Sequence, residues 1–379
     1  MQTKTTFEKT VVSGIEVKNR IFRSATHEGT AKDGKISDRM LDMYRNLSEG
    51  DVGLIITGYF GFSKTDYHNK GTVVLSDDSS ITGLEKLTET VHQHGSKIVT
   101  QINHAGSQLL SPPDGPVYGP SEVVDPFSGI TSIPFSVNQI SDLVTEFSDA
   151  AVMAQKAGFD GVQIHGAHGY LLNKFLSPAF NKRTDDYGGS PVKNARIVLE
   201  ILEEIKLKCG KDYPVWIKLN SSDFHPTDEG LNEEDFLLIV KELSKNGIDA
   251  IEVSGGTLTG KHPPSRSKKH AAYHLESAEK LAEDISIPVI LVGGLRNIDT
   301  IDRIMAETKI AAISMSRPLI REPRLVERWA AGDRQDAACI ACNGCFNPNG
   351  TICFFELGEE EKAAQKEVMK FLSSLGKKS

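Results

Sequence analysis

Short apolar runs alternate with amphipathic segments along most of the chain. Between the runs, apolar positions recur at helical spacing, as in residues 142–158, where Leu143, Phe147 and Ala154 share one face. Repeated strand–helix units imply a parallel sheet, and eight such units close into an α/β fold of the (β/α)₈ TIM-barrel type. A doubly wound sheet is the alternative, although no strand is followed by its usual Gly-x-Gly-x-x-Gly turn. The eight predicted strands are Arg20–Ala25, Gly53–Thr57, Lys97–Ile102, Gly161–His165, Val215–Leu219, Ala250–Val253, Pro288–Val292 and Ala311–Met315.

Several helix starts are marked by capping residues. Ser136 and Gln139 form a capping box ahead of the helix that covers residues 142–158. Ser190 followed by Pro191 marks a second start, since proline tolerates the first helical position, and Asn232 marks a third. The long segment 107–134 carries few helix signals, so a functional lid or disorder is expected there.

The chain is expected to divide into a barrel over residues 1–335 and a C-terminal extension over residues 336–379. The extension holds a cluster of cysteines and, after Leu357, one amphipathic helix. Its apolar side is predicted to carry Ala364, Val368, Phe371 and Leu372. This helix is expected to pack on the barrel or on a neighbouring subunit of a homo-oligomer.

Charge narrows the class of partner. The chain has 43 basic and 51 acidic residues, a net charge of −8, so a nucleic-acid or anionic-membrane partner is not expected. The first residues lack the apolar core of a signal peptide, and no apolar run approaches the length of a membrane span. A cytoplasmic protein with a small-molecule substrate is therefore predicted.

The most informative stretch is residues 161–190, GVQIHGAHGYLLNKFLSPAFNKRTDDYGGS. It places His165, His168 and Tyr170 just past a predicted strand, where catalytic residues of these barrels lie. Neutral imidazoles can donate to a developing oxyanion, and a phenol can supply a proton at neutral pH. The alternatives are ordinary core residues or a metal site, for which no third ligand stands at familiar spacing.

Residues 165–190 closely resemble the signature of the Old Yellow Enzyme family of flavin-dependent oxidoreductases, and the resemblance extends from about Phe7 to Arg334. It implies that His165 and His168 hydrogen-bond the activating oxygen of the substrate and that Tyr170 protonates the substrate carbon. It also implies an FMN cofactor with NAD(P)H as reductant. The residues predicted to bind FMN are Ala25, Thr26, His27, Gly58, Gln101, Lys218, Gly293, Gly294, Ser316 and Arg317.

Individual positions refine this resemblance. His27 fits the branch that resembles 2,4-dienoyl-CoA reductase, and Lys218 stands where many relatives have arginine beside the flavin. Tyr59 falls where many relatives carry a small residue, so it is expected to narrow or reshape the pocket. Gly293 and Gly294 after the seventh strand, with Ser316 and Arg317 after the eighth, are residue types that a phosphate site needs.

Four cysteines are clustered in the spacing Cys339-x₂-Cys342-x₂-Cys345-x₇-Cys353, whereas Cys209 stands alone. Four thiolates suffice for a [4Fe–4S] cluster or a structural zinc. The segment from Cys339 to Cys345 resembles the cluster-binding turn of the dienoyl-CoA reductase and trimethylamine dehydrogenase branch. The last spacing is shorter than in that branch, and the branch's additional nucleotide-binding domains are expected to be absent. An iron–sulfur cluster, zinc and free thiols all stay open.

Three functions follow. The first is an ene reductase, an FMN enzyme that uses NAD(P)H to reduce C=C bonds of α,β-unsaturated carbonyl or related compounds. The second is an FMN and iron–sulfur enzyme fed by a partner electron carrier, similar to a dienoyl-CoA reductase or an amine dehydrogenase. The third is a phosphate-binding aldolase or isomerase with Lys218 as a Schiff-base lysine. The basic loop 257–270, with His262, Arg266 and His270, has no assigned role.

Overall fold

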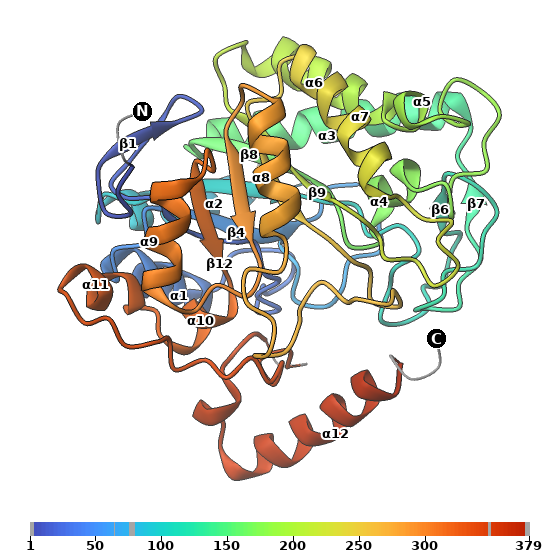
Figure 1. Cartoon of the computed structure of the whole chain (residues 1–379). Coiled ribbons are helices and arrows are strands. Elements are labelled where there is room, and N and C mark those ends of the chain that lie inside the picture. Colours follow the sequence, from blue (N-terminus) through green and yellow to red (C-terminus); the bar gives the residue numbers. More distant parts are fainter. Residues whose placement is uncertain (1–3, 64, 76–79, 348–349, 376–379) are drawn as a thin grey trace.

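The computed structural model is a closed barrel of eight parallel strands surrounded by helices (Figure 1). It describes residues 4–63, 65–75, 80–347 and 350–375, the last five of these by backbone alone. β12 pairs with β3 and so closes the sheet, which confirms the TIM barrel and excludes the doubly wound alternative. The eight strands are β3 (Ile21–Arg23), β4 (Leu54–Phe60), β5 (Lys97–Ile102), β8 (Gly161–Gly166), β9 (Val215–Asn220), β10 (Ala250–Ser254), β11 (Val289–Val292) and β12 (Ala312–Met315).

Each predicted strand is present, and its bounds differ from the prediction by three residues or fewer at either end. The predicted caps are also confirmed: Ser136 and Gln139 form a reciprocal capping box, and Ser190 and Asn232 cap their helices. The helices are α1 (Asp38–Glu49), α2 (Ile81–His92), α3 (Val137–Lys156), α4 (Leu171–Leu176), α5 (Pro191–Asn194), α6 (Arg196–Cys209), α7 (Glu233–Lys245), α8 (Leu275–Asp284), α9 (Ile298–Glu307), α10 (Arg317–Arg321), α11 (Leu325–Ala330) and α12 (Glu359–Leu375), with a 3₁₀ turn, η2, at Phe354–Glu356.

The amino-terminal end of the barrel is filled and covered. Phe22 and Trp216 stack inside it with ring centroids 6.1 Å apart, among aliphatic side chains from the other strands. The hairpin of β1 (Thr10–Val12) and β2 (Ile15–Val17) adds its buried side chains to the same cluster. Since this end is closed by apolar packing, any site must form at the carboxyl end, where loops follow the strands.

The long segment 107–134 is ordered rather than disordered. Two short strands, β6 (Tyr118–Gly119) and β7 (Ile133–Pro134), pair within it. The ammonium group of Lys174 on α4 forms a buried ion pair with Asp125 and donates to Ser107 Oγ at 2.5 Å. A buried pair of this kind fixes the loop on the helix that follows the histidine motif.

The C-terminal extension leaves the barrel and ends in α12, which lies apart from the barrel helices (Figure 1). The predicted orientation of this helix is partly wrong. Ala364 is exposed and Val368 is half-buried, whereas Gln365 is buried and donates to the carbonyl of Phe346. A buried backbone carbonyl needs a donor, and the Gln365 amide supplies one to the cysteine segment. The side chains of Phe371 and Leu372 lie outside the described residues.

Candidate active site

A strained turn presents the three predicted catalytic side chains. After β8, His168 (φ +65°) and Gly169 (φ +87°) adopt left-handed conformations, which are unusual for a histidine. The backbone N–H of His168 donates to Asn220 Oδ1 at 3.3 Å, and that of Gly169 donates to Asn173 Oδ1 at 2.6 Å. Tyr170 then begins α4 as its N-cap residue. Neighbouring amide side chains thus hold the turn that orients His168 and Tyr170.

The three side chains converge as the sequence predicts. The ring centroid of His165 lies 5.3 Å from that of His168 and 4.9 Å from that of Tyr170. His168 Nε2 is 2.7 Å from Ser254 Oγ, whereas His165 Nδ1 is buried with no hydrogen-bond partner among the described residues. Burial, with Lys218 nearby, holds the pKa of both imidazoles well below the usual range. Both rings are therefore neutral at physiological pH and can donate one N–H each.

Two further rings line the same mouth of the barrel. Tyr59, near the end of β4, stacks on His27 with centroids 4.6 Å apart and meets Tyr170 at 5.3 Å. Burial raises the pKa of Tyr170, so its hydroxyl keeps its proton at neutral pH. His27, Tyr59, Tyr170 and His165 form a continuous row of rings drawn from three strands of the barrel.

A buried polar network connects the predicted flavin-binding residues Lys218 and Gln101. Lys218 Nζ lies 3.2 Å from Glu252 Oε2 and donates to Ser24 Oγ at 2.9 Å. Gln163 donates to Glu252 at 2.9 Å and accepts from Gln101 at 2.7 Å. Glu252 and Gln163 were not among the residues predicted from the sequence. Both are polar residues inside otherwise apolar strands, and Glu252 stands opposite Lys218 in the β9–β10 ladder, which is the signal that would have found it.

Gly58 is explained by a carboxylate that packs against it. Buried Glu28 accepts hydrogen bonds from the Gly58 N–H at 2.7 Å, the Tyr44 hydroxyl at 2.6 Å and Arg23 at 3.3 Å. A Cβ atom at residue 58 would lie 2.0 Å from Glu28 Oε2. Glycine is therefore needed here for Glu28 to join β3 to β4, and its predicted approach to a ligand stays a prediction.

Gly58→Ala is expected to lower the free energy of unfolding by roughly 1–3 kcal/mol, as overpacking in a buried site does. A matched control is Gly83→Ala in α2, where the nearest atom to the new Cβ is 3.4 Å away. That control should stabilise the helix by up to about 1 kcal/mol. Urea unfolding of both variants tests the argument, and a Gly58→Ala protein as stable as wild type contradicts it.

The predicted phosphate-binding residues follow β11 and β12. Gly293 (φ +115°) and Gly294 (φ +71°) require glycine, and the loop that carries Tyr273 packs against them. Ser316 Oγ is 2.5 Å from Thr26 Oγ1, next to half-buried Ala25. The structure thus brings the ends of β3, β11 and β12 together, since β12 pairs with both of the other strands.

Arg317 has other partners in this structure. Its guanidinium donates to Asn343 Oδ1 at 2.6 Å, to the Ala341 carbonyl at 3.4 Å and to the Arg266 carbonyl at 3.0 Å. It therefore links the cysteine segment and the basic loop 257–270 to the end of β12. Its predicted contact with a phosphate stays a prediction.

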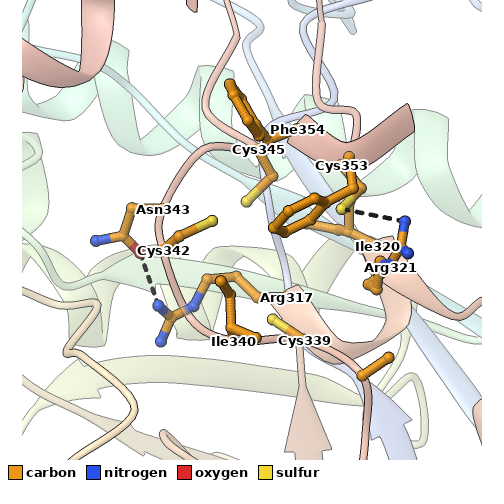
Figure 2. Close-up of a pocket in the computed structure, with 12 residues that line it drawn as sticks. Arg317, Ile320, Arg321, Cys339, Ile340, Cys342, Asn343, Cys345, Cys353 and Phe354 are labelled. Atoms are coloured by element: carbon orange, nitrogen blue, oxygen red, sulfur yellow. Dashed lines mark hydrogen bonds between the residues drawn. The ribbon is translucent and has the colours of Figure 1, made fainter. Parts of the chain in front are cut away.

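The four clustered cysteines line one pocket beside α10 (Figure 2). Figure 2 also shows Arg321, whose Nη1 lies 3.8 Å from Cys353 Sγ. Cys345 and Cys353 are buried, Cys342 is exposed, and burial raises the pKa of Cys345 to about 12. Across the described part of the chain, no three His, Cys, Asp or Glu side chains converge closely enough to hold one metal ion.

The cysteine segment also contacts the end of β3 directly. Thr351 Oγ1 donates to the His27 carbonyl at 2.5 Å, and the Thr351 N–H donates to the Glu28 carbonyl at 2.7 Å. The pocket of thiols and the row of rings are thus held by the same stretch of backbone.

Among the described helices, none is long and apolar enough to cross a membrane.

Comparisons with known proteins agree with this geometry. Residues 7–336 match the model of the NADH:flavin oxidoreductase / NADH oxidase family. The chain is 32% identical over 344 residues to a metal reductase of Desulforamulus reducens, covering 90% of this chain and 51% of that protein. It is 33% identical over 325 residues to an NADPH dehydrogenase of Bacillus pumilus, covering 85% of this chain and 93% of that protein.

A solved structure of 2-naphthoyl-CoA reductase in complex with 2-naphthoyl-CoA is also similar. It superposes with a TM-score of 0.85 and 25% identity, covering 92% of this chain and 56% of that one. The chain therefore spans about half the length of the metal reductase and of this reductase.

Proposed function

The chain belongs to the NADH:flavin oxidoreductase / NADH oxidase family, and from this premise we propose that it is an FMN-dependent, NAD(P)H-consuming reductase of activated C=C bonds. The observation that carries the proposal is the convergence of protonated Tyr170 with two neutral histidines at the mouth of the barrel. Family membership confirms the resemblance to the Old Yellow Enzymes and removes the aldolase or isomerase alternative, in which Lys218 would be a free Schiff-base lysine.

The residues at the mouth fit FMN. The buried ammonium of Lys218 and the amide of Gln101 stand on nearby strands, and such donors suit the pyrimidine edge of a flavin. We propose that the cofactor is held by the set predicted from the sequence: Ala25, Thr26, His27, Gly58, Gln101, Lys218, Gly293, Gly294, Ser316 and Arg317. When bound, FMN would supply the redox chemistry, the transfer of hydride from NAD(P)H to the β-carbon of an α,β-unsaturated carbonyl or nitro compound.

The protein's own side chains would handle the oxygen and the proton. His165 and His168 each have one N–H to donate to the activating oxygen, which gains negative charge during reduction. The hydrogen bond between Ser254 Oγ and His168 Nε2 orients the His168 ring. Tyr170 Oη gives its proton to the α-carbon, so that one C–H bond forms as the O–H bond breaks, and the phenolate is then reprotonated by solvent.

Purification without oxygen tests the proposal. The protein should carry FMN, be bleached by NADPH or NADH, and regain its colour on addition of 2-cyclohexenone with formation of cyclohexanone. Protein that carries no flavin, and binds none when FMN is added, would contradict it.

A cytoplasmic location, where reduced nicotinamides are maintained, fits this function.

The pH dependence follows from the shifted pKa values. Because the histidine pKa values lie below about 6.5 and the Tyr170 pKa lies above about 10, no group of the three titrates between these limits. The rate constant for C=C reduction, measured by stopped-flow with pre-reduced enzyme, should therefore be flat from about pH 6.5 to 9.5. A bell-shaped profile centred within that range would assign the acid or the donors to other groups.

A second candidate uses the cysteines. Four thiols line one pocket, but no three of them converge closely enough to hold one metal ion. This arrangement favours either a group with several metal atoms or free thiols over a single bound ion. If the thiols hold a [4Fe–4S] cluster, the protein would be an FMN enzyme fed by a partner electron carrier. Iron, zinc and acid-labile sulfide, measured on anaerobically purified protein, separate the cases: about four irons and four sulfides per chain would support the cluster.

A further inference from the structure

Tyr59 is a second phenol beside the proposed proton donor. It is 7% exposed and lies between His27, on which it stacks, and Tyr170. Asn69 Nδ2 donates to the Tyr59 hydroxyl oxygen at 2.7 Å. Since an amide nitrogen can only donate, the oxygen of Tyr59 is the acceptor in this bond, and its own proton must be directed elsewhere.

The phenol next to Tyr59 is Tyr170, whose ring centroid lies 5.3 Å from that of Tyr59. The nearby side chains of Tyr59 and Gln108 lower the pKa of Tyr170, against the larger, opposite effect of burial. Gln108 Oε1 lies close to Gly169, 2.4 Å from where a Cβ would stand, so only glycine leaves room for it there. A phenol that accepts a hydrogen bond on its oxygen keeps its own proton for a ligand.

We propose that Tyr59 is a positioning residue for the proton donor: Asn69 orients the Tyr59 hydroxyl, which donates to Tyr170 Oη. This bond turns the Tyr170 proton toward the substrate and stabilises the negative charge that stays on Tyr170 Oη after the proton has moved to the α-carbon. Hydrogen bonds to charged groups are stronger than neutral ones, so the stabilisation grows as the proton leaves. The inference rests on the proposed function.

Tyr59→Phe tests the proposal because it keeps the ring and its stacking on His27 but removes the hydroxyl. Reduction of 2-cyclohexenone by pre-reduced enzyme should slow about 10- to 100-fold, the range expected for one hydrogen bond to a charged group. The solvent isotope effect on that step should rise, while bleaching of the enzyme by NADPH keeps its wild-type rate. Tyr213→Phe is the matched control, since Tyr213 is also a buried phenol, 8% exposed, but precedes β9 at the other end of the barrel.

The double variant Tyr59→Phe/Tyr170→Phe decides whether Tyr59 acts through Tyr170. If it does, adding Tyr59→Phe to Tyr170→Phe changes the rate by less than about twofold. Equal effects of Tyr59→Phe in both backgrounds, or a wild-type rate in the single variant, would overturn the inference. Failure of the proposed function is distinguishable, because the wild-type protein itself would then not reduce 2-cyclohexenone.

Discussion

Tyr170→Phe is expected to slow C=C reduction by roughly 10²- to 10⁴-fold, the usual contribution of a positioned general acid. Its hydroxyl is the protonated group that stands with both neutral histidines, at a centroid distance of 4.9 Å from His165. Phenylalanine keeps the ring in this row, so binding of FMN and of the substrate should change little. Stopped-flow measurement of the two half-reactions separately gives the effect directly.

The comparison between half-reactions makes this prediction specific. Bleaching by NAD(P)H needs no proton from Tyr170, so its rate constant should stay within about twofold of wild type. Equal slowing of both half-reactions would mean that the substitution disturbs the site as a whole and would remove Tyr170 from the role of proton donor. An unchanged rate of C=C reduction would assign the proton to solvent.

The barrel and the grouping of the three proposed catalytic side chains were predictable because both depend on local patterns. Each apolar run is long enough to form one strand, and the closing pair β12–β3 follows once eight parallel strands are present. His165, His168 and Tyr170 lie within six residues of one another, so one turn determines their arrangement. One short motif was therefore enough to predict how these three side chains are grouped.

Contacts between distant segments were not predictable in this way. Glu28 packs on Gly58, 30 residues away, and Glu252 accepts from Ser24, 228 residues away. The sequence shows a carboxylate in an apolar run but not the partner that makes its burial tolerable. Arg317 is a similar case, since its bond to Asn343 depends on how the cysteine segment returns to the barrel.

Glu252→Gln is expected to lower the free energy of unfolding by about 3–5 kcal/mol, the usual cost of leaving one member of a buried ion pair alone. Glu252 is fully buried and accepts from Ser24 at 2.7 Å, Ser314 at 2.6 Å and Gln163 at 2.9 Å, with Lys218 at 3.2 Å. An amide would bring a donor into a ring of donors and leave the ammonium of Lys218 buried without a counter-charge. Urea unfolding with and without saturating FMN measures the loss, because a bound ligand adds its own stabilisation.

Two controls separate the buried charge from a general effect of the substitution. Glu16→Gln removes a carboxylate from the exposed Lys9–Glu16 pair, where both side chains are more than half exposed, and should cost less than about 1 kcal/mol. Lys218→Met/Glu252→Gln removes both charges and should recover much of the lost stability, since an apolar replacement of a buried pair is often neutral. If Glu252→Gln unfolds at the wild-type urea concentration, Lys218 does not depend on Glu252 for its counter-charge. The ammonium would then be compensated by another group at the barrel mouth, and Lys218→Met alone should destabilise the protein no more than the double variant.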